Sequence, residues 1–191
     1  MNKKLFDHYI MSLPKGAKLL DAGCGNGFNS EYVHSIRPDI KIFGADIDNS
    51  LRKILPSYIT FFNKSITNLK DFNNAYFDCI ICFHVLEHLK NPDAAISEFN
   101  RILRGGGVVI SEVPHPITVF SPIGFNFYND PTHVRPYTKK NFGRLFNKFN
   151  IIFLSFDESS HYCLSGKKDF FRNLLFFLNL YKTVSFVIAR K

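Results

Sequence analysis

Residues 18–27 read KLLDAGCGNG, an apolar run that leads into a glycine-rich turn and carries one carboxylate, Asp21, near its end. Glycine has no Cβ, so the repeated glycines let the backbone turn tightly and approach a ligand closely. Dinucleotide-binding turns follow the spacing G-x-G-x-x-G and receive a pyrophosphate, but the sixth position here is Phe28. Asp21 would also repel a phosphate by roughly 3 kcal/mol at ~5 Å and an effective dielectric of about 20. The turn therefore suits a positively charged ligand, such as a sulfonium or an ammonium group.

A second apolar run, residues 40–45, follows a helix-like stretch at 30–36 and ends at another carboxylate, Asp46. A G-x-G turn alone is a weak signal, but a glycine turn, a helix and an acid-ended strand in this order form a specific combination. The combination resembles the first motifs of class I S-adenosylmethionine-dependent methyltransferases, and the resemblance extends over residues 15–150. The alternative is a Rossmann-like turn without a ligand, whose glycines serve packing only.

The resemblance implies S-adenosyl-L-methionine as the cofactor. Asp21 and the glycine turn would hold its methionine end, and Asp46 would accept hydrogen bonds from the two ribose hydroxyls. Relatives often carry an acidic residue for the adenine after the third strand, where this sequence has Ser65 and Ile66. The predicted cofactor-binding residues are Asp21, Gly23, Cys24, Gly25, Asn26, Gly27, Asp46, Ile47, Ser65, Ile66 and Phe83.

Apolar runs alternate with helix-like stretches along the chain, a pattern that predicts a parallel sheet with helices on both faces. The clearest helix is 91–104, because Asn91 can cap it and Pro92 suits its first position. Another helix is expected at 139–149, after Thr138. The fold class is therefore α/β: a Rossmann-like, doubly wound, mostly parallel seven-stranded sheet. We expect its strands at 17–22, 40–46, 58–63, 77–84, 107–113 and 150–157, with an antiparallel last strand at 183–190, as the resemblance implies.

The length of 191 residues, with 46% hydrophobic and 21% charged residues, fits one globular domain with a sizeable core. We expect a single methyltransferase domain over 1–191, with a cofactor-binding half at 1–113 and a substrate-facing half at 114–191. The sequence shows neither a signal-peptide pattern nor an apolar run of the roughly 20 residues that span a bilayer, so we predict a cytoplasmic location. Cys79 and Cys82 would point to opposite faces of a strand, so we interpret them as apolar core residues.

The net charge of +8 is unevenly distributed, because residues 1–130 hold 13 basic and 13 acidic side chains while residues 131–191 hold 11 and 3. This asymmetry favours an acidic substrate, a phosphate-bearing lipid surface or nucleic acid, although a basic surface also promotes solubility. The apolar stretch 167–182 is either a core helix or a rim that faces lipid or acceptor. The predicted partner is a small-molecule or glycan-related acceptor, acidic or lipid-linked, with peripheral membrane contact as an option. Nucleic acid is disfavoured because no RNA-binding module is recognisable, and the oligomeric state stays open.

The expected fourth strand leads into residues 84–88, HVLEH, and His84 is one candidate catalytic residue. As H-x-x-E-H the segment also matches a zinc-peptidase motif, which would have to lie on a helix. Some methyltransferase relatives have E-x-x-E-H here and bind a divalent ion, but this chain has a histidine at the first acidic position. Two imidazoles and one carboxylate would suit a transition metal better than magnesium. We predict no metal, with Glu87 paired locally and His88 packed near the cofactor.

Residues 129–138, NDPTHVRPYT, resemble a segment of many bacterial methyltransferases with small-molecule or surface-glycan substrates. The prolines stiffen this loop and would hold its polar side chains over the cleft. His133 is the second candidate catalytic residue, as a general base, because imidazole titrates near working pH. The alternative for His133 is a hydrogen bond to backbone that orders the loop. Arg135 could bind a carboxylate or a phosphate through two parallel hydrogen bonds.

Methyl transfer requires little from a protein beyond alignment of the nucleophile with the S–CH3 bond, exclusion of water and removal of a proton. The sequence therefore predicts an S-adenosylmethionine-dependent methyltransferase that acts on a small-molecule or a glycan- or lipid-linked acceptor. The alternative is a non-catalytic S-adenosylmethionine-binding module with a regulatory or scaffold role. A nicotinamide oxidoreductase is disfavoured by Phe28 and Asp21.

Overall fold

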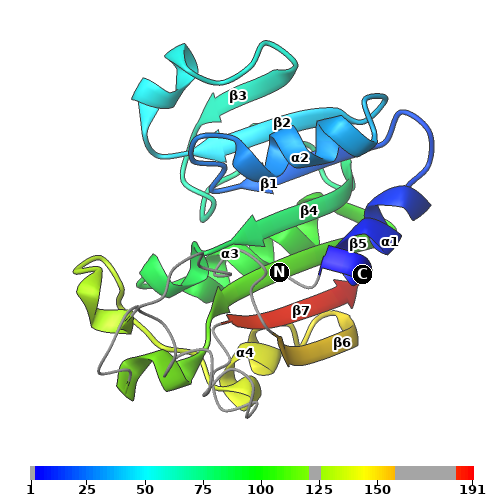
Figure 1. Ribbon diagram of the computed structural model, residues 1–191. Helices are drawn as coiled ribbons and strands as arrows, with labels where there is room; N and C mark the ends of the chain where they lie inside the picture. Colours follow the sequence, from blue (N-terminus) through cyan, green and yellow to red (C-terminus); the bar gives the residue numbers. More distant parts are fainter. Residues whose placement is uncertain (1–2, 121–125, 158–183) are drawn as a thin grey trace, which may run out of the picture.

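The computed structural model describes residues 3–120, 126–157 and 184–191, which form one seven-stranded sheet with flanking helices (Figure 1). The strand order is β3-β2-β1-β4-β5-β7-β6. β1 to β5 pair in parallel, and β7 runs antiparallel to both of its neighbours. This confirms the predicted α/β sheet and its reversed last strand.

The elements are α1 (Lys3–Ser12), β1 (Lys18–Ala22), α2 (Phe28–Ile36), β2 (Lys41–Asp46), η1 (Asn49–Lys53), β3 (Ile59–Asn63), β4 (Phe77–Phe83), η2 (Leu86–His88), α3 (Pro92–Ile102), β5 (Leu103–Pro114), η3 (Pro116–Phe120), η4 (Phe127–Asn129), α4 (Lys139–Leu145), β6 (Asn150–Asp157) and β7 (Val184–Arg190).

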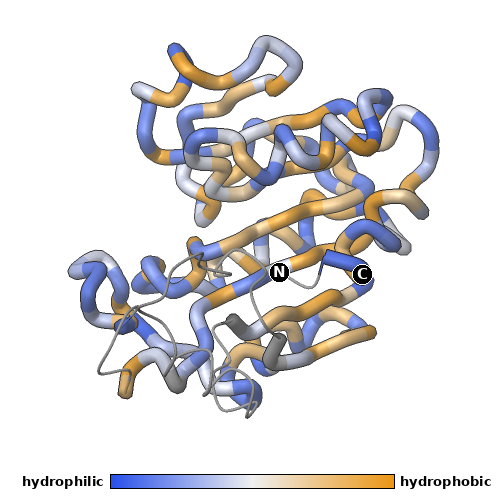
Figure 2. Tube along the Cα trace, in the orientation of Figure 1, coloured by the Kyte–Doolittle hydropathy of each residue, from blue (hydrophilic) through white to orange (hydrophobic). Residues whose placement is uncertain are grey.

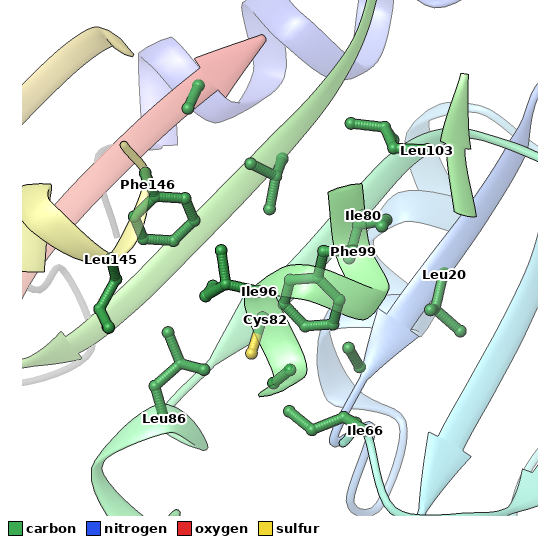
Figure 3. Packing of buried hydrophobic residues seen from close by; sticks show 14 of the residues in the cluster. Leu20, Ile66, Ile80, Cys82, Leu86, Ile96, Phe99, Leu103, Leu145 and Phe146 are labelled. Carbon is green, nitrogen blue, oxygen red and sulfur yellow. The ribbon is translucent and has the colours of Figure 1, made fainter. Parts of the chain in front are cut away.

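A hydrophobic core lies on each face of the sheet. On one face α1 and α2 bury side chains such as Phe6 and Val33. On the other face α3 and α4 bury side chains such as Phe99 and Leu145 (Figure 3). β4 is buried along its whole length, as expected for a central parallel strand with both faces covered, and Figure 2 shows its hydrophobic character. Cys79 and Cys82 belong to opposite cores, as predicted.

The junction of α3 and β5 differs from the prediction. Asn91 caps α3 as expected, because its Oδ1 accepts a hydrogen bond from a backbone N–H of the first turn at 3.2 Å. The helix ends at Ile102, however, and β5 begins at Leu103 instead of residue 107. Leu103 pairs with Phe77 of β4 before the ladder shifts its register. Pairing with β4 therefore takes the chain out of the helix before it reaches the glycines.

Two further helices differ from the prediction. α4 is capped by Thr138, whose hydroxyl oxygen accepts a hydrogen bond from Asn141 N at 3.2 Å, but it ends at Leu145 rather than at residue 149. Gly143 lies inside this helix, and glycine weakens a helix by about 1 kcal/mol relative to alanine. The N-terminal helix α1 was not predicted from the sequence. It buries Phe6 against the sheet.

The connection between β3 and β4, residues 64–76, contains no helix and is instead held by side chains of α3. The guanidinium of Arg101 donates hydrogen bonds to the carbonyls of Leu69 and Phe72, at 2.9 and 2.8 Å. Glu98 Oε2 accepts a hydrogen bond from Leu69 N at 2.7 Å. These contacts satisfy the polar backbone of the loop and fix the path by which it leaves β3.

The predicted helix at 167–182 lies outside the described residues, as does residue 183 of the predicted last strand. The division into halves at 1–113 and 114–191 therefore stays a prediction. Within the described ranges, no helix has both the length and the apolar character needed to cross a lipid bilayer.

Candidate functional site

The glycine turn after β1 adopts backbone conformations that favour glycine. Gly23, Gly25 and Gly27 have φ angles of 82°, 49° and 83°, in the left-handed region that other side chains disfavour. A Cβ at Gly23 would also collide with the side chain of Val85. The N–H of Gly23 donates a hydrogen bond to the Ala45 carbonyl at 2.8 Å, so the turn is joined to β2.

Asp46 meets this turn from the end of β2. Its Oδ2 accepts a hydrogen bond from Gly25 N and its Oδ1 accepts one from Asp48 N, both at 3.0 Å. Each carboxylate oxygen has capacity for a further hydrogen bond. The carboxylate is thus held in one orientation and can accept hydrogen bonds from two neighbouring hydroxyls, which fits the predicted ribose contact.

A pocket of about 360 Å³ opens at the carboxyl ends of β1, β2 and β4. Ligands of doubly wound sheets bind at this edge, beside the point where the strand order reverses. Its size lies within the range of about 300–1,000 Å³ that is typical of small-molecule sites. The residues predicted from the sequence that line it are Gly23, Gly25, Asp46, Ile47, Ser65, Ile66 and His84. His88, which the sequence placed near the cofactor, also lines it, and three lining residues were missed by sequence reasoning: Lys64, Val85 and Leu89.

The adenine-binding residues predicted from the sequence lie along this pocket. Ile47 is 78% exposed, so it offers an apolar face at the pocket wall without any other element covering it. Ile66 is buried in the core beside the pocket. The Ser65 hydroxyl lies 2.8 Å from Thr67 Oγ1 and accepts a hydrogen bond from Thr67 N at 3.3 Å. Its contact with adenine stays a prediction.

Asp21 is buried at the end of β1 and is 1% exposed. Ser30 donates a hydrogen bond from its Oγ to Asp21 Oδ2 at 2.7 Å. Burial raises the pKa of Asp21 to about 6, although the hydrogen bonds from Ser30 act in the opposite direction. A positive charge close to this carboxyl group would favour its ionised form. A cationic ligand bound nearby would therefore lower the pKa of Asp21.

The other predicted cofactor residues do not line the pocket. The Cys24 thiol packs beside Gly44, and burial raises its pKa to about 12. Asn26 is exposed, and its Oδ1 accepts a hydrogen bond from the backbone of the following helix at 3.3 Å. Phe83 packs on Phe6 in the core, with ring centroids 5.7 Å apart. Gly27 begins α2. Their contacts with a cofactor stay predictions.

His84 faces the pocket as part of a charged cluster. Its Nε2 lies 3.0 Å from Glu112 Oε1, and its Nδ1 lies 3.5 Å from Glu87 Oε1. Burial lowers the pKa of His84, but its hydrogen bond with Glu112 and its ion pairs with Glu112 and Glu87 outweigh this effect and raise the pKa to about 10. His84 is therefore an imidazolium near neutral pH. That state argues against proton abstraction by this candidate catalytic residue and indicates an ion-pairing role.

The zinc-peptidase interpretation of residues 84–88 is wrong, because η2 is a single three-residue turn and not a helix that presents two histidines. The structure does bring potential metal ligands together, but in a different set. Glu87, His88 and His133 offer ligand atoms that all lie within 4.8 Å of one another. His84 is not part of this group, and His133 is brought in from the loop before α4.

His133 is almost buried, with 5% of its side chain exposed. Its Nδ1 donates a hydrogen bond to the Phe127 carbonyl at 2.5 Å, and its ring stacks on the Phe127 ring at 4.4 Å. The loop-ordering hydrogen bond that the sequence left open is thus present, and the general-base role stays a prediction. Val134 N and Arg135 N both donate to the Glu87 carbonyl, so this loop is docked on η2, while the Arg135 side chain is exposed.

Comparison with known proteins gives a consistent result. The methyltransferase domain family matches residues 3–151. A protein of Mycolicibacterium smegmatis, named "Probable S-adenosylmethionine-dependent methyltransferase", is 33% identical over 125 residues, which are 63% of this chain and 46% of that protein. A ubiquinone biosynthesis O-methyltransferase of Alkalilimnicola ehrlichii is 25% identical over 103 residues, which are 50% of this chain and 41% of that protein. The chain therefore spans less than half the length of these curated relatives.

A solved structure shares the whole fold. The crystal structure of a SAM-dependent methyltransferase from Archaeoglobus fulgidus aligns with 99% of this chain and 92% of its own, with a TM-score of 0.74 and 21% sequence identity. At this identity the likeness shows the fold, and the family match over most of the chain shows the relationship. The chain belongs to the methyltransferase domain family, within the class I S-adenosylmethionine-dependent methyltransferases, and its cofactor is S-adenosylmethionine.

Proposed function

We propose that this chain transfers the methyl group of S-adenosylmethionine to a small-molecule acceptor. The observation that carries the proposal is the Asp46 carboxylate, which two backbone N–H groups hold at the wall of the pocket. The glycine turn and the exposed Ile47 both line the pocket. A ribose with two hydroxyls and an apolar adenine match these two features.

The glycine turn leaves room for a ligand to contact its main chain, as the proposal requires. Gly25 lines the pocket, and a Cβ at this position would meet no atom within 4 Å. The ligand can therefore approach the main chain of the turn. Asp21, buried behind the turn with a raised pKa, would be ionised by a nearby sulfonium or ammonium group and would stabilise it.

The chemical step demands little of the side chains. With the cofactor bound, a lone pair of the acceptor forms a bond to the methyl carbon while the C–S bond breaks and its electron pair stays on sulfur. The protein would align the acceptor with that bond and exclude water. The imidazole of His88 lines the pocket and would take up the proton that a hydroxyl acceptor loses.

A small-molecule acceptor is supported by the pocket size and by the name of the ubiquinone biosynthesis O-methyltransferase, which matches half of this chain. The proposal of a glycan- or lipid-linked acceptor depends on the basic residues of 131–191, four of which lie outside the described part of the chain. A glycan- or lipid-linked acceptor and any membrane contact are therefore predictions separate from the proposed small-molecule acceptor.

The experiment is label transfer from methyl-labelled S-adenosylmethionine into a fractionated bacterial extract and into a panel of phenols and catechols. We expect release of S-adenosylhomocysteine and label in the low-molecular-mass fraction, with both signals lost in Asp46→Ala. Label in the macromolecular or lipid fraction would contradict the small-molecule class. Tight binding of S-adenosylmethionine, with no product above the Asp46→Ala background in any fraction, would instead favour the non-catalytic binding module.

A further inference from the structure

The Glu87 carboxylate is buried in an unusual state. Its side chain has an exposed fraction of 0%, and within the described part of the chain neither of its oxygens accepts a hydrogen bond. Its ion pair with His84 runs through Oε1 alone and is 3.5 Å long. A buried carboxylate is strongly disfavoured unless hydrogen bonds or cations compensate for its lost hydration. The long contact with His84 compensates only one of the two oxygens, so the surroundings of Glu87 point to a second cation.

Two imidazoles beside Glu87 have their tautomers set by their neighbours. Thr132 donates its hydroxyl hydrogen to Asp130 Oδ1, so the same oxygen accepts a hydrogen bond from His88 Nδ1 at 2.8 Å. His133 Nδ1 donates to the Phe127 carbonyl at 2.5 Å. In the neutral form both rings therefore carry their lone pair on Nε2. Histidines that bind metals show this arrangement, with the second ring nitrogen hydrogen-bonded to protein.

The backbone holds these three side chains together. The Glu87 carbonyl accepts hydrogen bonds from Val134 N and Arg135 N, at 2.9 and 3.2 Å, so the loop that carries His133 is fixed to the turn that carries Glu87 and His88. The rings of His88 and His133 lie 4.7 Å apart between centroids. The three ligand atoms lie within 4.8 Å of one another. Bonds of about 2.0–2.2 Å to one ion place its ligand atoms up to about 4.3 Å apart. A small rotation of the side chains would therefore bring all three ligand atoms within bonding distance of one ion.

We propose that Glu87, His88 and His133 bind one divalent transition-metal ion at the border of the cofactor pocket. Two imidazoles and one carboxylate favour zinc, cobalt or iron(II) over magnesium, which requires mainly oxygen ligands. The carboxylate of Asp130, 3.9 Å from His133 Nε2 through its Oδ2, adds negative charge around the ion. His84 stays outside the site, because both of its ring nitrogens face carboxylates.

The proposal changes the expected roles of the histidines. His88 lines the pocket, so an ion bound to it would lie beside the cofactor pocket and would act there as a Lewis acid. An acceptor oxygen on the ion would lose its proton more readily. The His133 lone pair would then serve the metal, and this residue would not act as a general base. The inference goes beyond the proposed function and does not depend on it, since metal binding is measured without the cofactor.

The test uses the full chain after treatment with a chelator. Equilibrium dialysis against Zn²⁺, Co²⁺ or Mg²⁺ alone, followed by elemental analysis, should find one equivalent of Zn²⁺ or Co²⁺ and weaker binding of Mg²⁺. The Co²⁺ protein should absorb in the visible range. Glu87→Gln and His133→Ala should each weaken Zn²⁺ binding by more than about tenfold, since loss of an outer partner alone costs about 10–100-fold. His8→Ala is the matched control, because His8 is exposed on α1, and it should bind as the wild type does.

Circular dichroism and S-adenosylmethionine titration show whether each variant is folded. If one variant fails to fold, the other variant and the wild-type Co²⁺ spectrum still decide the question. The proposal is overturned if the wild type binds neither Zn²⁺ nor Co²⁺, if Mg²⁺ binds more tightly than both, or if folded Glu87→Gln and His133→Ala proteins match the His8→Ala control.

Discussion

The backbone N–H of Gly25 lies 3.0 Å from Oδ2 of Asp46, so one hydrogen bond joins the turn after β1 to the end of β2. Gly25 belongs to the glycine turn and Asp46 ends the second strand, and the sequence analysis predicted that both motifs bind the cofactor. Their hydrogen bond orients the carboxylate before any ligand arrives, and such preorganisation reduces the ordering cost of binding. The Asp46 side chain therefore serves both the turn and the proposed ribose contact.

We expect Asp46→Ala to weaken S-adenosylmethionine binding by about 10–100-fold or more, because hydrogen bonds to a charged group contribute about 1.5–3 kcal/mol each. Isothermal titration calorimetry measures the change. Asp48→Asn is the matched control, since it removes one negative charge two residues away and asparagine can still cap η1. Equal losses in the two variants would show a general charge effect and contradict the ribose contact.

Gly23→Ala should destabilise the fold by about 2–5 kcal/mol. The left-handed conformation costs a residue with a Cβ about 1–2 kcal/mol, and the clash with Val85 adds overpacking strain of about 1–3 kcal/mol. Urea denaturation measures the free energy of unfolding. Gly105→Ala is the control, because the space beside Gly105 is open. If both variants lose the same stability, the glycine turn is not conformationally demanding.

Much of this fold was predictable because its signals are local. The glycine turn and Asp46 follow apolar runs, and the parallel pairing of β1 with β2 then brings them to one edge. The start of β5 was not predictable in the same way. Leu103 leaves the helical pattern because it pairs with Phe77, a contact between residues that are distant in the sequence.

The candidate site was likewise predictable only in part. The lining residue Val85 could have been inferred from its place directly after the fourth strand, opposite Gly23, but only with the strand order known. The group of Glu87, His88 and His133 depends on two hydrogen bonds from a distant loop to the Glu87 carbonyl. Sequence spacing instead grouped His84 with Glu87 and His88, because it cannot show that Glu112 pairs with His84.

His84→Asn should destabilise the protein by about 1–3 kcal/mol at pH 6, because two buried carboxylates lose their cation and the half-exposed ring reduces the effect. Asparagine tolerates the positive φ of this position. The pKa of His84 is raised from 6.5 to about 10, so its contribution is fully present below pH 6.5 and is lost as the pH rises through 10. Urea denaturation between pH 6 and 10.5 should show the wild type and the variant converging. A difference that stays constant over this range would contradict the ion pairs.

Asp21→Asn should stabilise the fold at neutral pH while it impairs the site. The pKa of Asp21 is raised from 3.8 to about 6, so the folded state binds a proton more tightly than the unfolded state does. Folding stability therefore falls as the pH rises from 4 to 6 and is constant above that range. The variant should gain up to about 3 kcal/mol at pH 8 and nothing below pH 4. Asp71→Asn, at an exposed carboxylate, should show no such gain in the same denaturation series.

The same carboxyl group should make cofactor binding depend on pH. A sulfonium or ammonium group favours ionised Asp21, whereas protons compete below a pKa of about 6, so S-adenosylmethionine affinity should fall by up to about tenfold between pH 7 and pH 5. Titration calorimetry at several pH values measures this slope. The Asp21→Asn protein should bind weakly with a flat profile, and S-adenosylhomocysteine, which lacks the sulfonium charge, should show a shallower slope on the wild type. Parallel slopes for the wild type and Asp21→Asn would place the proton uptake at another group and remove Asp21 from the methionine end of the site.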